Sequence, residues 1–374
     1  MEIPTVLSLA NITEQAWNEA IKKHDIVLDQ YDGVSFYRAV KKVGKLDRGS
    51  VITGSEIIYE YPRIARILHL ENGIKAEYTA PFYVEEKVDG YNVRITRVQG
   101  RILAFSRGGF ICPFATDRLE DFFDVKGFFK KNPDLVICGE IAGPGNPYNL
   151  EYPPYVKEDA QLFAFDVRIK NSSKPIPVER RYEVFDTYGI PTVGRYGKFS
   201  VDEIDKLKGM IKNLNETGLE GFVFKPTNLR EKTLKYVTVG SCLRDLRVTT
   251  HLMAELPPEF FTHRIIRALF YLQEHGFNSQ PDFIERLGKV IALPLQRTVG
   301  KISSDEMIVE QFHLRFRRKK NIKNLMDHLH RCKIDAKITS QKKVGDYWHV
   351  EYTRRYFPTF EMLQKYWQGG SHVD

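Results

Sequence analysis

The chain has 374 residues, 42% of them hydrophobic and 28% charged, which excludes wholesale disorder and allows two or three domains with sizeable cores. Its formal net charge of +8 favours a polyanionic partner such as nucleic acid. The four cysteines form no Cys-x-x-Cys pair, no apolar run could span a bilayer, and the N-terminus lacks a basic leader. We therefore expect a cytoplasmic protein without structural zinc, disulfides or membrane contact.

Residues 1–62 are predicted to form a small α/β module. A helix capped by Asn11 or Thr13 precedes two short strands in residues 50–61, and no chemistry is apparent there. Residues 63–240 are rich in predicted strands that follow one another as antiparallel hairpins. This pattern favours an α+β fold over regular βαβ units, and neither a Gly-x-Gly-x-x-Gly nor a Walker-type loop is present.

The most informative stretch is Val84–Ile95, in which an apolar lead-in runs into Lys87, an Asp-Gly turn and an alternating run. This pattern predicts strand, turn, strand, with Lys87 at the mouth of the turn and with Asn92 and Arg94 on one side of the second strand. A lysine on which polar groups converge suits covalent catalysis. For such a stretch taken alone, a surface hairpin lysine is the commoner interpretation.

The C-terminal third has a different character. Residues 241–300 are predicted to be helical, and apolar residues at helical spacing in 257–293, interrupted near Gly276–Pro281, indicate a helix pair. The aromatic stripe of this pair is either core or a subunit interface. Residues 301–374 are predicted to form a small α/β module, and its basic stretch over residues 314–323 is either a solvated face or a phosphate-binding surface.

An ordered series of short motifs follows the Lys-x-Asp-Gly element of Lys87 along the chain. Its members are Ser106-Arg107, Gly139-Glu140, Phe165-Asp166, Glu220–Lys225 and Leu234-Lys235. This order resembles the covalent nucleotidyltransferase superfamily, which contains ATP-dependent DNA ligases, RNA ligases and mRNA capping enzymes. In such chemistry a deprotonated lysine attacks the α-phosphate of a nucleotide, while Mg²⁺ and further lysines neutralise the phosphates.

The resemblance implies a role for each position. Lys87 is the expected nucleophile, and Lys225 and Lys235 are expected to neutralise phosphates. Glu220 is expected to hold the metal, with Glu140 on the ribose or on an outer-shell water of the metal. The other expected nucleotide contacts are Glu85 at the adenine edge, Phe165 stacked on the purine, Arg107 at a nucleotide phosphate or RNA 5′-phosphate, and Asn92 and Arg94.

Two features depart from the superfamily pattern. Lys235 lacks the second lysine of the usual Lys-x-Lys motif, so Lys232 is an alternative for this position. Strict alternation along a strand puts Glu220 and Lys225 on opposite faces. A bulge or a strand end must therefore intervene if both side chains line one pocket.

The branch of the superfamily is indicated by Asn92 and by the C-terminal third. DNA ligases and capping enzymes typically place arginine at the position of Asn92 and continue into an OB-fold, which is absent from this pattern. The layout, with strings such as CGEIAGPGNPY, resembles the archaeal-type ATP-dependent RNA ligases over essentially the whole chain. The resemblance implies ATP as cosubstrate, Mg²⁺ or Mn²⁺, single-stranded RNA with 5′-phosphate and 3′-hydroxyl ends, RNA circularisation, and a homodimer through residues 257–293.

Two alternatives remain open at this level. One is an ATP-dependent DNA ligase, and the other is a non-catalytic nucleic-acid-binding protein with a decayed transferase fold, which the intact Lys87, Glu140 and Glu220 disfavour. The sequence does not indicate the physiological RNA, whether circularisation is the biological role, the preferred divalent metal or the growth temperature.

Overall fold

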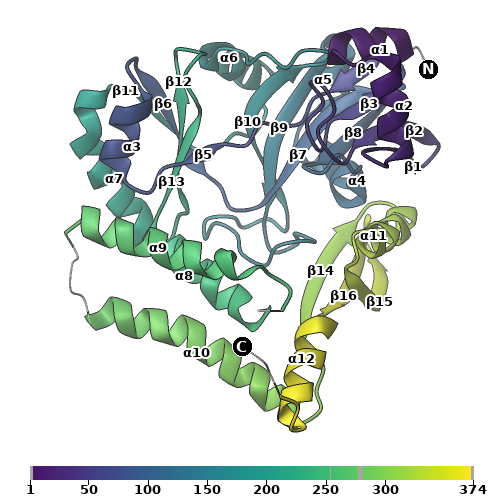
Figure 1. The fold of residues 1–374 in the computed structure, drawn as a ribbon. Helices are drawn as coiled ribbons and strands as arrows, with labels where there is room; N and C mark the ends of the chain where they lie inside the picture. The colour runs from purple at the N-terminus through teal and green to yellow at the C-terminus, as the bar shows by residue number, and fades with distance from the viewer. Residues whose placement is uncertain (1–2, 253, 277–280, 372–374) are drawn as a thin grey trace.

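The computed structural model describes residues 3–252, 254–276 and 281–371 (Figure 1). Its first elements form an antiparallel sheet of order β1-β2-β3-β4, which shares a hydrophobic core with two helices. Thr13 caps the second helix, because its hydroxyl accepts a hydrogen bond from the amide of Ala16 at 3.2 Å. These elements are α1 (Ile3–Ala10), α2 (Glu14–Lys22), β1 (Ile26–Tyr31), β2 (Val34–Ala39), β3 (Val51–Thr53) and β4 (Glu56–Ile58).

Two further sheets make up the central part of the molecule, one of order β10-β9-β7-β8 and one of order β11-β6-β12-β13-β5. The strands are β5 (Ala65–Arg66), β6 (Phe82–Lys87), β7 (Tyr91–Val98), β8 (Arg101–Ser106), β9 (Leu135–Ala142), β10 (Gln161–Ile169), β11 (Arg195–Phe199), β12 (Gly221–Pro226) and β13 (Leu234–Val237). Neighbouring strands are antiparallel except β13 and β5, so the predicted α+β fold with antiparallel sheets is confirmed.

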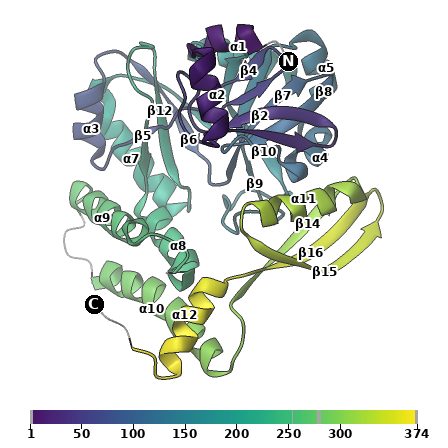
Figure 2. The ribbon, with the colours of Figure 1, turned by 45° about the vertical axis from the view of Figure 1, so that its right-hand side comes forward.

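Helices cover the outer faces of these sheets (Figures 1 and 2). Helix α7 packs apolar residues against β12 and its neighbours, whereas α4 and α5 share a core with β7, β8 and β9. The helices of this part are α3 (Leu70–Glu77), α4 (Pro113–Phe122), α5 (Val125–Lys131), α6 (Val178–Tyr188), the 3-10 helix Val201–Glu203, α7 (Ile204–Glu216) and α8 (Val239–Thr249).

The strands on either side of Asp89-Gly90 do not pair with each other, so the predicted hairpin at this turn is wrong. β6 pairs with β11 and β12, whereas β7 pairs with β8 and β9. The chain therefore leaves one sheet at Lys87 and enters the other at Tyr91. A Cβ at Gly90 would lie 2.5 Å from the carbonyl oxygen of Ile141 in β9, so this crossing requires glycine.

The predicted helix pair is present as α9 (Pro258–Glu274) and α10 (Pro281–Ser303), preceded by the 3-10 helix Thr250–Leu252. Residues 277–280 of the predicted interruption lie outside the described residues. Helix α10 continues beyond residue 293, through Pro294, although a proline removes one backbone hydrogen bond from a helix. None of the described helices is long and apolar enough to cross a membrane.

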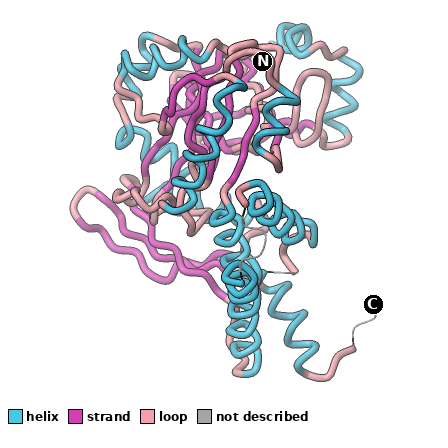
Figure 3. Tube along the Cα trace, turned by 90° about the vertical axis from the view of Figure 1, so that its left-hand side faces the viewer, coloured by secondary structure: helices cyan, strands magenta, loops and turns pink. Residues whose placement is uncertain are grey.

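The last part of the chain is a three-stranded antiparallel sheet of order β14-β16-β15 with two helices. Its elements are β14 (Val309–Phe316), α11 (Lys319–Arg331), β15 (Asp335–Val344), β16 (Tyr347–Arg355) and α12 (Phe357–Trp367). Figures 2 and 3 show this C-terminal module and α10 at the end of the molecule away from α1. The module shares a core with the central part, because Phe316 meets Phe114 of α4 edge-on at 5.5 Å.

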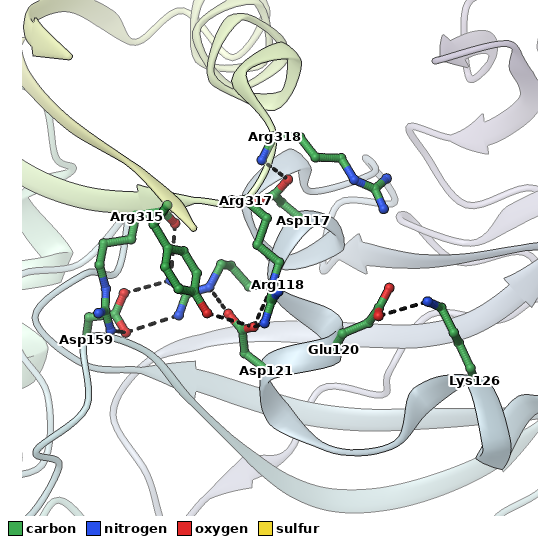
Figure 4. Close-up of polar contacts among 10 residues, drawn as sticks. Asp117, Arg118, Glu120, Asp121, Lys126, Asp159, Arg315, Arg317 and Arg318 are labelled. Atoms are coloured by element: carbon green, nitrogen blue, oxygen red, sulfur yellow. Dashed lines mark hydrogen bonds and ion pairs between the residues drawn. The ribbon is translucent and has the colours of Figure 1, made fainter. Parts of the chain in front are cut away.

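A network of ion pairs also joins the C-terminal module to the central part (Figure 4). Arg118 of α4 donates to Asp159 at 2.7 and 3.1 Å and also binds Asp121. From the C-terminal module, Arg315 binds Asp159 and Arg317 binds Asp121. The first arginines of the basic stretch 314–323 are thus engaged in an internal interface and present no free charge to a phosphate.

We expect Arg118→Ala to lower the free energy of unfolding by roughly 3 kcal/mol, because a buried ion pair that loses one partner leaves an uncompensated charge. Urea denaturation followed by tryptophan fluorescence measures this change. In the control Arg180→Ala, the residue removed is an ion-pair partner of Glu183 whose side chain is 68% exposed. This substitution should change the free energy of unfolding by less than about 1 kcal/mol. Equal effects of the two substitutions would contradict the role of Arg118.

Candidate active site

A cavity between the two central sheets brings together the predicted site residues from across the chain. Its wall contains every one of them except Arg94 and Glu220. The predicted residues that line it are Glu85, Lys87, Asn92, Arg107, Glu140, Phe165, Lys225 and Lys235. The order of motifs along the sequence therefore corresponds to one place in the structure.

Lys87 is the last residue of β6 and its ammonium lies at the junction of the two sheets. Its Nζ is 2.6 Å from Oε1 of Glu220, and its side chain is 19% exposed. Burial acts to lower the pKa of Lys87, but the carboxylate of Glu220, together with Asp89 and Glu140, raises this pKa above its ordinary value. In the protein without ligands, Lys87 is therefore a protonated partner of Glu220 and is not yet nucleophilic.

Glu220 reaches Lys87 because it lies just before strand β12, which resolves the conflict with Lys225. The strand begins at Gly221, which has φ +153° and pairs with Lys87. A Cβ at Gly221 would collide with the carbonyl oxygen of Tyr236 in β13. Glycine thus permits the change of direction that places Glu220 outside the alternation of the strand.

Glu140 and Asn92 lie opposite each other on β9 and β7 at the floor of the cavity. Burial, together with the nearby Glu220, raises the pKa of Glu140 to about 7, although Lys87 opposes the shift. The Oδ1 of Asn92 and the Oε2 of Glu140 are buried without a hydrogen-bond partner. Such atoms are costly unless a ligand satisfies them.

The acidic groups fit a divalent cation of the magnesium type. Like Glu140, Glu220 has a buried carboxylate oxygen without a hydrogen-bond partner. The described residues contain no group of three or more histidine, cysteine, aspartate or glutamate side chains arranged to hold a metal. A pair of carboxylates suits Mg²⁺, which keeps several of its waters and takes one or two protein carboxylates.

The buried Lys225 pairs with Glu85 on the neighbouring strand at 2.6 Å. Tyr182 of α6 donates its hydroxyl to the other oxygen of Glu85 at 2.9 Å. Lys225 also donates to the backbone carbonyl of Phe165, so both ends of the pair are fixed, and both line the cavity. This fixed charge is preorganised for a polar ligand, because no side chain must be reordered to meet it.

Phe165 projects an aromatic ring into the cavity from a bulge in β10. The pairing of β10 with β9 shifts between Ala164 and Asp166, so Phe165 stands outside the regular ladder. Its ring meets the ring of Tyr61 edge-on, with centroids 4.9 Å apart and planes at 70°. A ring held in this way can offer its face to a purine.

Lys235, and not Lys232, lies at the cavity. Burial, with the neighbouring cation Arg66, lowers the pKa of Lys235 to about 8. Arg66 lies beside it in register on the parallel strand β5. Lys232 instead makes an exposed ion pair with Glu77 at 3.2 Å. The structure therefore favours Lys235 for the last motif.

Arg94 does not line the cavity, so the structure does not place it where the expected nucleotide contact would be made. Its side chain is fully buried and donates to four backbone carbonyls of other segments, the most distant being Ile58 at 3.5 Å and the other three lying closer. These are Tyr59 at 2.8 Å, Gly49 at 2.8 Å and Ser106 at 2.9 Å. The alternation along β7 correctly predicts that Arg94 and Asn92 share one side of the strand. It cannot predict that the cavity ends between these two residues.

Sequence reasoning assigned no role in the site to the segment of residues 61–66. Tyr61, Pro62 and Ile64 line the cavity, and Arg66 lies beside Lys235. The arginines at positions 63 and 66 were the available signal, since they interrupt an otherwise apolar linker. Without knowledge of the sheet pairing, that signal does not separate a wall of the cavity from a surface connection.

A lysine at the junction of two antiparallel sheets, with two carboxylates, an aromatic ring and further lysines around it, defines a covalent nucleotidyltransferase. Residues 80–237 match the family model described as RNA ligase, and residues 248–370 match the one described as the C-terminal region of the ligase Pab1020. With the likeness to solved structures below, these matches show that the chain belongs to the archaeal-type ATP-dependent RNA ligase family.

Relatives share the fold over its full length. A protein of Aquifex aeolicus, provisionally named an ATP-dependent DNA ligase, is 38% identical, with a TM-score of 0.92 over 96% of this chain and 100% of its own. An archaeal ATP-dependent RNA ligase is 28% identical, with a TM-score of 0.92 over 100% of both chains. An uncharacterized protein of Methanocaldococcus jannaschii, MJ0414, is 26% identical over 89% of this chain and 87% of its own.

We expect Glu220→Gln to lower the pKa of Lys87, because burial would no longer be offset by an adjacent carboxylate. The rate at which a small acylating reagent modifies Lys87, followed by peptide mass spectrometry between pH 6 and pH 11, reports this pKa. The midpoint should move to lower pH. The control Glu77→Gln, which changes the distant partner of Lys232, should leave it in place. An unchanged midpoint in Glu220→Gln would refute the ion-pair explanation.

Proposed function

We propose that the protein joins 5′-phosphate and 3′-hydroxyl ends of single-stranded RNA, including the two ends of one molecule, in an ATP-dependent reaction. The observation that supports this most is the position of Lys87. It lies 2.6 Å from Glu220 in a cavity that also holds Glu140, Phe165 and Lys225. Membership of an ATP-dependent ligase family supports ATP as the cosubstrate.

In the proposed first step, the amine of Lys87 attacks the α-phosphate of ATP. A nitrogen–phosphorus bond forms, the bond to the β-phosphate oxygen breaks, and pyrophosphate leaves. In the second step AMP passes from Lys87 to the 5′-phosphate of RNA. In the third, the 3′-hydroxyl of the other end attacks that phosphate, and AMP departs as the phosphodiester forms.

The residues of the cavity have separate tasks in this sequence. Phe165 stacks on the purine and Glu85 lies at its edge, held there by its ion pair with Lys225, while Lys235 neutralises phosphate oxygens. Glu140 and Glu220 would hold a divalent cation, Mg²⁺ or Mn²⁺, which supplies positive charge to the phosphates when bound. With the Glu220 carboxylate engaged by such a cation, Lys87 would lose the partner that favours its protonated form.

RNA is the proposed substrate in preference to DNA. The unpartnered Oδ1 of Asn92, buried in the cavity wall, is an acceptor suited to a ribose hydroxyl, although the ribose of AMP offers one as well. DNA is the alternative, because a relative that is 38% identical carries the provisional name of a DNA ligase. The choice therefore rests on experiment.

Lys87→Arg should abolish the covalent protein–AMP adduct formed with [α-³²P]ATP and a divalent cation, because a guanidinium stays protonated. Gel autoradiography measures the adduct, and Lys232→Arg serves as the matched control. The wild-type enzyme should seal 5′-phosphorylated single-stranded RNA faster than nicked DNA. An adduct formed on the Lys87→Arg variant would refute the assignment of Lys87 as the nucleophile. Faster sealing of nicked DNA than of RNA would identify DNA as the substrate.

We also propose that two copies of the chain associate through α9 and α10. Both helices expose large apolar side chains, although most such groups in the described residues are buried. On α9 these are Ile266, Leu269 and Phe270, which have the spacing of one helical face, and on α10 they are Ile284, Leu293 and Val299. Apolar patches of this kind mark interaction surfaces.

Leu269→Asp with Phe270→Asp should give a monomer, since a charge in an apolar interface must be desolvated without a partner. Size-exclusion chromatography with light scattering would show the mass of one chain instead of two. The control Leu28→Asp, at an exposed position of β1, should leave the mass unchanged. A dimer that persists in the double variant would place the interface elsewhere.

A further inference from the structure

The N-terminal residues 1–60 contribute a second hollow directly beside the nucleotide cavity, although no step above uses them. This hollow, about 410 Å³, is formed by the turn of residues 42–48 and the linker of residues 60–63. Its lining residues are Lys42, Asp47, Arg48, Glu60, Pro62 and Arg63. Because Pro62 lines both spaces, the hollow adjoins the nucleotide cavity.

The turn that contains Arg48 packs directly against the turn that contains Arg107. The buried guanidinium of Arg94 donates to Gly49 and Ser106, one residue from each of these arginines. A Cβ at Gly49 would collide with the carbonyl oxygen of Arg107, so the two turns are in direct backbone contact. The hollow and the Arg107 edge of the nucleotide cavity thus form one fixed rim.

The charges along this rim are largely uncompensated. Arg48, Arg63 and Arg107 are exposed, and among the described residues no carboxylate lies within ion-pair distance of them. Of the two acidic residues in the hollow, Asp47 pairs with Lys42 at 3.2 Å. Glu60 is half-buried, and burial raises its pKa while Arg107 and Arg63 act on it in the opposite direction. Free guanidinium groups are strong, bidentate ligands for phosphates.

We propose that Arg48 and Arg63 bind the phosphodiester backbone of the RNA strand whose 5′-phosphate receives AMP, continuing a path that starts at Arg107. The inference rests on the proposed function, since the strand must reach the nucleotide on Lys87. In the proposed function the phosphates of ATP are neutralised separately, by Lys235 inside the cavity. In this proposal the N-terminal residues contribute to holding the RNA strand at the site.

The test is the affinity of Arg48→Ala with Arg63→Ala for 5′-phosphorylated single-stranded RNA, measured by fluorescence anisotropy at several salt concentrations. We expect binding about tenfold weaker at low salt, and a slope of log K against log salt that is smaller by roughly 1.4, or 0.7 for each lost phosphate contact. The control Lys126→Ala with Arg180→Ala removes two exposed positive charges from α5 and α6 and should change neither quantity.

Wild-type affinity and slope in the Arg48/Arg63 variant would overturn the proposal, and so would an equal loss in the control, which would indicate general charge attraction. The adduct of the wild-type protein with labelled ATP is measured in parallel. Its absence would refute the proposed ligase function, whereas the anisotropy arm does not depend on adduct formation. Failure of the inference and failure of the function are therefore distinguishable.

Discussion

The passage of the chain between two sheets at Gly90 is the constraint on which the active site depends. Lys87 ends a strand of one sheet and Asn92 lies near the start of a strand of the other, so the proposed nucleophile lies where the sheets meet. The backbone of β9 approaches so closely that a side chain at position 90 has no room. Glu140 on β9 is brought to Lys87 by the same approach.

Two lysine–glutamate ion pairs lie at the cavity. Lys87 is paired with Glu220, and Lys225 with Glu85. The pairs differ in their surroundings, because Lys225 is nearly inaccessible whereas Lys87 is partly exposed. The Lys87–Glu220 pair is therefore accessible from the cavity, whereas the Lys225–Glu85 pair is enclosed. A resting lysine that is protonated also avoids side reactions of a free amine.

The sequence was sufficient for the fold class and for most of the cavity, because the motifs occur in order and each lies at or near a strand. The sequence was insufficient wherever the position of a residue depends on pairing between strands that are distant in the chain. The hairpin expected after Lys87 requires two neighbouring strands, and the structure places them in separate sheets. The face of Glu220 depended on the conformation of Gly221. The ion pair of Arg315, in the basic stretch of residues 314–323, is not visible in the sequence because its partner, Asp159, lies far away along the chain.

The shared core of the C-terminal module has a consequence for dividing the protein. Phe316 and Phe114 belong to one continuous apolar cluster, and Arg118 binds carboxylates on the same surface. A fragment ending before residue 308 would expose the apolar side of α4 to water and would leave Asp121 and Asp159 with fewer cationic partners. The central part is therefore not an autonomous unit, and chimeras that exchange the C-terminal module must exchange the surface of α4 with it.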